Sequence, residues 1–131
     1  PAVAGSDEGS GNVRRCYLGP EAGAEALLVV FSGHFPEAAE LGYDVPFEFK
    51  RFLGRHPLRV HALFLRDLSM SWYLGGVEGL GDSVGEVADF IAREREQLGV
   101  SRLFTLGSSM GGYAALLFGH LLRADVALAF G

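Results

Sequence analysis

A serine between two glycines is the feature of this sequence best suited to chemistry. Ser109 lies at the centre of residues 107–111, which match the pattern G-x-S-x-G. The strand-like run 103–106 precedes this pattern and the helix-like run 113–122 follows it. On such a strand-to-helix turn a serine holds its hydroxyl above a sheet, and the glycines make room for the strained bend. The pattern therefore predicts a nucleophile elbow, with Ser109 as the nucleophile in acyl chemistry.

Acyl chemistry also needs hydrogen-bond donors for the negatively charged oxygen of the tetrahedral intermediate. The main-chain N–H of Met110, directly after the serine, is the expected first donor. The second is expected from the loop after the apolar run 26–31, where Gly33 and His34 are the candidates. The residues alone do not separate these two. A plain turn at the end of a strand is the alternative explanation for this loop.

Other polar and aromatic residues are weaker candidates. The imidazole of His34 is an alternative in-chain general base for the serine. Asp67 ends a strand-like run at the edge where parallel sheets place their chemistry, so it is a candidate acid or a residue that supports the acid–base pair. An ion pair with Arg66, or the capping of a turn, is a commoner role for such an aspartate. Trp72 and Tyr73 are candidates for lining a substrate entrance, or for covering the core.

Composition limits the classes of function. The net charge is −5 and no basic run occurs, which argues against nucleic acid or an anionic membrane as partner. The single cysteine, Cys16, excludes an internal disulfide and a Cys-based zinc site. No metal-ligand spacing and no nucleotide P-loop pattern is present. We therefore expect a cytoplasmic protein with no metal or cofactor, which acts on a small-molecule ester or acyl substrate.

The apolar pattern predicts alternating strands and helices. Strand-like runs occur at 13–18, 26–31, 58–65, 102–106 and 125–130. Helices are predicted at 46–53, 84–98 and 110–123. The run 26–31 is apolar on both faces, as a central parallel strand needs to be. This order predicts the α/β class, with a mainly parallel sheet of four to five strands flanked by helices.

Local signals place the ends of some elements. Ser83 and Glu86 form a capping box at the start of the helix 84–98, and Gly99 follows its end. The helix 110–123 is almost wholly apolar and is therefore expected to be buried. Residues 1–12 show no apolar period and are predicted to be a flexible leader. The remaining residues, 13–131, are predicted to form one domain.

With its elbow on a strand-to-helix turn, the chain resembles the α/β-hydrolase superfamily. More narrowly, it resembles bacterial hydrolase-like proteins with an Arg-Asp, a Trp-Tyr, a glycine-rich stretch and Gly-Ser-Ser-Met-Gly-Gly-Tyr. These pieces are here residues 66–67, 72–73, 75–81 and 107–113. Over 26–131 the resemblance implies the third to sixth strands of that fold. It also implies a serine hydrolase or acyltransferase that forms an acyl-enzyme on Ser109.

The sequence departs from the superfamily in one respect. The superfamily supplies an acid and then a histidine from strands later in the chain. Beyond Ser109, the histidine is His120 and the acid is Asp125, neither in the expected place. We therefore interpret 13–131 as a partial α/β-hydrolase-like domain, the N-terminal part of a longer protein or a degenerate relative.

The sequence is also compatible with two functions other than catalysis. The first is a non-catalytic hydrolase-like interaction module, in which the elbow serves only as architecture. The run 125–130 would then present an exposed apolar edge, which is expected to pair copies of the chain into a homo-oligomer. The second is an anion- or phosphate-binding domain that uses the N–H groups at the start of the helix 110–123.

Overall fold

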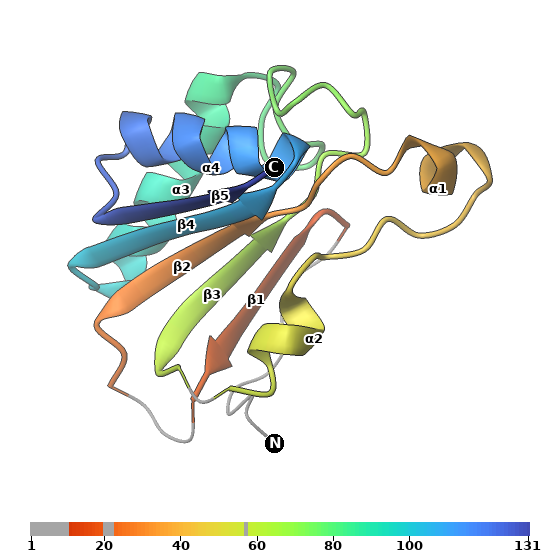
Figure 1. The fold of residues 1–131 in the computed structure, drawn as a ribbon. Coiled ribbons are helices and arrows are strands. Elements are labelled where there is room, and N and C mark those ends of the chain that lie inside the picture. Colours follow the sequence, from red (N-terminus) through yellow and green to blue (C-terminus); the bar gives the residue numbers. More distant parts are fainter. Residues whose placement is uncertain (1–10, 20–22, 57) are drawn as a thin grey trace.

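A single mixed sheet forms the centre of the fold (Figure 1). The computed structural model of the protein describes residues 11–19, 23–56 and 58–131. Within these residues the strands are β1 (Val13–Leu18), β2 (Ala26–Phe31), β3 (Val60–Leu65), β4 (Arg102–Ser108) and β5 (Val126–Phe130). Their order in the sheet is β1-β3-β2-β4-β5. β1 is antiparallel to β3, and all other neighbouring strands are parallel.

The strands follow the apolar runs of the sequence. All six residues of β2 are buried, because β2 lies inside the sheet and both of its faces are covered. The short run 13–18 is an edge strand. The predicted fold class is confirmed: the protein is α/β, with a mainly parallel five-stranded sheet flanked by helices.

Helices lie on both faces of the sheet (Figure 1). They are α1 (Pro36–Glu40), α2 (Lys50–Leu53), α3 (Val84–Leu98) and α4 (Met110–Leu121). α3 and α4 cover one face, and α2 lies against the other. The capping box is present: Ser83 Oγ accepts a hydrogen bond from Glu86 N at 3.1 Å, and Gly99 ends α3 with a φ of 67°. No helix of the described segments is both long enough and apolar enough to cross a membrane.

Two of the predicted helices differ from the observed ones. The helix expected over 46–53 is reduced to α2, because Phe49 adopts a left-handed backbone with a φ of 62° and delays the helix start. The prediction that α4 is buried is wrong for one of its faces. Met110, Ala114 and Phe118 pack on the sheet, whereas Leu116 is 56% exposed. An apolar composition does not reveal that a helix is covered on one side only.

The first and the last described segments differ in how far they are buried. Residues 1–10 of the predicted leader lie outside the described residues. Asn12, at the end of that segment, is buried and bonded to Arg66 and to the main chain of Glu78, so it belongs to the packed domain. At the other end, β5 pairs with β4, and its large apolar side chains, Val126, Leu128 and Phe130, are 45–52% exposed.

Candidate active site at the β4–α4 turn

The turn between β4 and α4 has the strained backbone that the G-x-S-x-G pattern predicts. Ser109 has a φ of 56° and a ψ of −122°, a region that residues with a side chain seldom occupy. A Cβ atom on Gly107 would lie 2.0 Å from Gly111 O, and one on Gly111 would lie 2.1 Å from Phe31 O. Both positions therefore require glycine. Ser109 itself is exposed to solvent at the end of β4.

Main-chain hydrogen bonds hold this bend in place. Ser109 N donates to Phe130 O at 2.8 Å, and Tyr113 N donates to Ser109 O at 3.1 Å. The N–H of Met110 has no acceptor among the residues that the structure describes. Such an N–H at the first position of a helix points out of the helix start. The Met110 side chain is fully buried, so the residue offers its surroundings a main-chain donor and nothing else.

The loop after β2 lies against this bend. Besides its contact with Phe31 O, a Cβ on Gly111 would approach the main chain of Ser32 to 3.0 Å. From the loop side, a Cβ on Gly33 would lie 2.8 Å from Ser108 O. The glycines of both segments therefore allow the two turns to touch. The tertiary structure thus brings Gly33, and with it the loop that carries His34, against the β4–α4 turn.

The peptide group between Ser32 and Gly33 is held from both sides. Its carbonyl oxygen, Ser32 O, accepts a hydrogen bond from the hydroxyl of Tyr73 at 2.8 Å. Its N–H, on Gly33, donates to Glu48 Oε1 at 2.6 Å. Ser32 N also donates to Leu65 O at 2.9 Å, which ties the loop to the end of β3. The Gly33 N–H is therefore already engaged by a carboxylate.

The two amides that follow Gly33 in the loop differ in whether their N–H has an acceptor. Phe35 N lies 3.3 Å from the sulfur of Met70, to which it donates. Between the engaged amides of Gly33 and Phe35, the N–H of His34 has no acceptor within the described part of the chain. The side chain of His34 is exposed. Of the two donors left open by the sequence, His34 is the one whose N–H is available.

Asp67 organises the loop that follows β3. Asp67 is 2% exposed, and its carboxylate accepts five hydrogen bonds, from the N–H and hydroxyl groups of Ser69 and Ser71 and from Tyr73 N. Burial pushes the pKa of Asp67 upward, but the bonds from Ser69, Tyr73 and Ser71 outweigh it, so the pKa lies below its ordinary value. Asp67 thus caps a turn as an ionised carboxylate.

Arg66 has its own partners elsewhere. Its Nη1 donates to Asp44 Oδ1 at 2.6 Å and to Val45 O at 2.7 Å, and its Nε donates to Asn12 Oδ1 at 3.0 Å. Of the two commoner roles considered for Asp67, the structure therefore shows the capping of a turn and not an ion pair with Arg66.

The loop held by Asp67 carries both aromatic candidates. Trp72 and Tyr73 have positive φ values of 60° and 62°. Tyr73 is fully buried, so it does not line an entrance but covers the core. Burial, and then the negative charge of Asp67, raises the pKa of Tyr73 well above its ordinary value. Its hydroxyl is therefore a permanent donor to Ser32 O.

Trp72 lies on the open side of the same loop and is 42% exposed. Its ring meets that of Tyr113 edge-on, with centroids 5.8 Å apart, and the His34 ring lies at 6.3 Å. Tyr113 is one helical turn beyond Ser109. These three rings form an aromatic surface beside the elbow. The sequence analysis includes Tyr113 in the motif 107–113 but does not identify it as a site residue, although its position four residues after the serine was the available signal.

The remaining histidines and the last acid lie away from the elbow. His120 is exposed on α4, three turns from the start of that helix. Asp125 accepts a hydrogen bond from Leu103 N at 2.8 Å, at the end of β4 opposite to Ser109. His61 lies in the first half of β3, and its ring contacts Tyr17. The described residues contain no cluster of three or more His, Cys, Asp or Glu suited to a metal ion.

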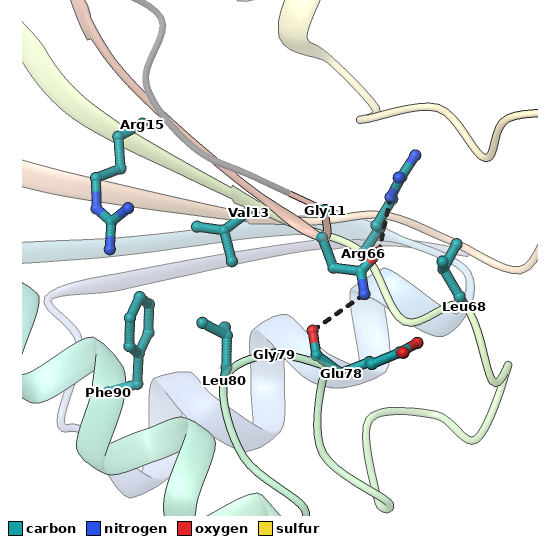
Figure 2. Close-up of a pocket in the computed structure, with 10 residues that line it drawn as sticks. Gly11, Val13, Arg15, Arg66, Leu68, Glu78, Gly79, Leu80 and Phe90 are labelled. Carbon is teal, nitrogen blue, oxygen red and sulfur yellow. Dashed lines mark hydrogen bonds between the residues drawn. The ribbon is translucent and has the colours of Figure 1, made fainter.

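A separate cleft of about 560 Å³ opens beside β1 (Figure 2). Asn12 is one of its lining residues and bonds to Arg66 Nε and to Glu78 O. Arg15 and Phe90 line the other end, where the guanidinium lies 5.5 Å from the ring centre. Both arginines are ion-paired, Arg15 with a glutamate of α3 and Arg66 with Asp44. β3 and β2 separate this cleft from the end of β4.

No protein-family model matches the chain, and no curated protein is similar to it. Among solved structures, the chain is similar to MGS-MChE2, described as an alpha/beta hydrolase enzyme from the metagenome of sediments from the lagoon of Mar Chica, Morocco. The identity is 18% and the TM-score 0.46, over 94% of this chain and 49% of that one. The chain thus spans about half the length of that hydrolase.

Proposed function

We propose that this chain carries the nucleophile and the oxyanion hole of a serine hydrolase or acyltransferase. The supporting observation is the arrangement at the β4–α4 turn. Ser109 is exposed on a bend with a φ of 56°, and the amides of Met110 and His34 have no acceptor among the described residues. Strain of this kind persists only where the surrounding structure maintains it, and it concentrates at functional sites.

In the proposed reaction Ser109 Oγ attacks the carbonyl carbon of an ester. The hydroxyl proton passes to a general base, and the carbonyl oxygen becomes an oxyanion that accepts hydrogen bonds from the N–H groups of Met110 and His34. The tetrahedral intermediate then collapses, and the alcohol leaves with the proton from the base. The acyl-enzyme on Ser109 is resolved by water in a hydrolase, or by an acceptor alcohol or amine in a transferase.

We assign the general base to a histidine that this sequence does not contain, because its four histidines are all among the described residues and none is placed for the role. Within them, His56, His61 and His120 lie away from the bend, and the His34 ring rests beside Trp72 on the surface. The substrate is a small ester or acyl compound, and the aromatic surface of His34, Trp72 and Tyr113 would contact its apolar part. No cofactor takes part in this scheme.

A fluorophosphonate probe tests the proposal, because such probes phosphonylate an activated serine. Labelling is expected of folded wild-type protein that includes the general base, and Ser109→Ala should abolish it. Ser108→Ala is the matched control, since Ser108 is the adjacent serine but belongs to β4, and it should retain labelling. Absence of label on that protein, or label that survives Ser109→Ala, would refute the nucleophile.

The binding-domain alternative makes a different prediction. If the open amides bind an inorganic anion, phosphate should raise the melting temperature by mass action. A flat phosphate titration, combined with labelling of Ser109, favours the enzyme over an anion-binding domain.

A further inference from the structure

We infer that Glu48 is a positioning residue for the oxyanion hole, which it builds by holding the Gly33 amide and thereby directing the His34 amide toward the elbow. This inference rests on the proposed function. It concerns a residue that the sequence did not single out, 15 positions beyond Gly33 and outside every motif.

The contact between Glu48 and the loop has several parts. Glu48 Oε1 accepts the Gly33 N–H at 2.6 Å, and a bond from an N–H to a carboxylate is about twice as strong as a neutral one. Glu48 N in turn donates to Ser32 Oγ at 3.1 Å, and that hydroxyl donates to Pro46 O at 2.9 Å. The segment containing Glu48 is thus bonded to two successive residues of the loop.

The orientation of the loop follows from the planarity of its peptide groups. The Ser32–Gly33 peptide is held at its oxygen by Tyr73 and at its N–H by Glu48, so its plane has one orientation. Further along, the Phe35 amide is held by Met70. The His34 amide lies between these two anchored groups, and only rotations within Gly33 and His34 could turn it. Releasing Glu48 would free one of the two anchors.

The close approach at Gly33 shows that this contact belongs to the site. A Cβ on Gly33 would lie 2.7 Å from Glu48 Oε1 and 2.8 Å from Ser108 O. The carboxylate and the peptide before the nucleophile therefore flank the same glycine. A negative charge so close to an oxyanion would oppose catalysis, so a role for Glu48 must come from its acceptor geometry rather than from its charge.

Two substitutions of Glu48 separate the effect of its acceptor oxygen from the effect of its charge. Glu48→Gln keeps an acceptor oxygen at the same reach and removes the charge, whereas Glu48→Ala removes both. Glu37→Ala is the matched control, because Glu37 is an exposed carboxylate of α1 without a side-chain bond to the described residues. We expect Glu48→Ala to lower the maximal rate of fluorophosphonate labelling by about 10- to 100-fold, the range that a small misplacement of a site costs.

The half-saturating probe concentration should not change, since the oxyanion hole acts on the phosphonyl oxygen in the transition state and not on probe binding. Glu48→Gln should stay within about threefold of wild type, because it restores the acceptor. A wild-type rate in Glu48→Ala, or a Glu48→Gln variant as slow as Glu48→Ala, would overturn the inference. Glu37→Ala should label at the wild-type rate.

Amide hydrogen exchange separates failure of this inference from failure of the proposed function. Gly33 should be protected in the wild-type protein and in Glu48→Gln, and unprotected in Glu48→Ala. An unprotected Gly33 in the wild type overturns the role of Glu48 even if Ser109 is labelled. A protected Gly33 in wild-type protein that includes the general base and is still unlabelled rejects the proposed function, and the positioning role with it. If Glu48→Ala does not fold, Glu48→Asp withdraws the acceptor by one methylene and should show the same loss of rate.

Discussion

Replacing Ser109 with glycine should stabilise this protein while removing its proposed nucleophile. The φ of 56° and ψ of −122° at Ser109 match the first central position of a type II′ turn, where glycine is the residue without steric cost. A residue with a side chain held in such a sparsely populated region costs about 1–3 kcal/mol. Glycine would remove that cost.

Part of this gain is offset in the unfolded state. Glycine makes the unfolded chain more flexible, which costs about 0.4–1 kcal/mol relative to alanine. The net gain is therefore about 1 kcal/mol, and for a domain of this length it corresponds to a rise in melting temperature of about 3–5 °C. Ser109 makes no side-chain hydrogen bond to the described residues, so loss of its hydroxyl adds no further term.

The assay compares thermal or urea unfolding of wild type, Ser109→Gly and Ser109→Ala. Alanine keeps the Cβ atom and hence the strain, so it should unfold within about 0.5 kcal/mol of wild type, as surface substitutions do. Both variants should be unreactive toward a fluorophosphonate. If Ser109→Gly is no more stable than Ser109→Ala, the bend is not strained and the physical basis for the elbow is refuted.

Two further perturbations test the groups around the elbow. Asp67→Asn should destabilise the protein by more than about 1 kcal/mol, because an amide cannot accept all five hydrogen bonds. Since the folded pKa of Asp67 is depressed, its stabilising effect is present above the unfolded value of about 4 and is lost as the pH falls toward the folded value. Urea unfolding between pH 6 and pH 2 should therefore show a smaller loss of stability on acidification in Asp67→Asn than in wild type; equal slopes would contradict the assignment. Gly111→Ala should destabilise by about 1–3 kcal/mol or more, because its Cβ would lie 2.1 Å from Phe31 O. Gly85→Ala in α3, where the nearest atom is 3.9 Å away, should instead be neutral or stabilising, and equal melting temperatures for the two variants would show that the close approach at Gly111 is not real.

Several features were accessible from the sequence because they depend on neighbouring residues. The glycines at 107 and 111 predict the strained turn, since the bend is made within a few residues. The Ser83–Glu86 capping box predicts the start of α3, because both partners lie in one helical turn. The turn around Asp67 was also readable, as its partners Ser69 and Ser71 follow at two and four positions, although it was assigned a catalytic alternative.

Other features were decided by the tertiary structure, because the partners are far apart in the sequence. The N–H of Gly33 is engaged by Glu48, 15 positions further along the chain, and the N–H of Phe35 by Met70, 35 positions further along. These distant partners leave His34, and not Gly33, as the open donor. The burial of Tyr73 beneath the loop depends on Ser32, 41 positions earlier. The exposed face of α4 reflects which layers surround that helix. A pattern of residue types sets local backbone geometry, whereas the partner of each N–H group and the cover over each helix are set by which distant segments meet at the sheet edge.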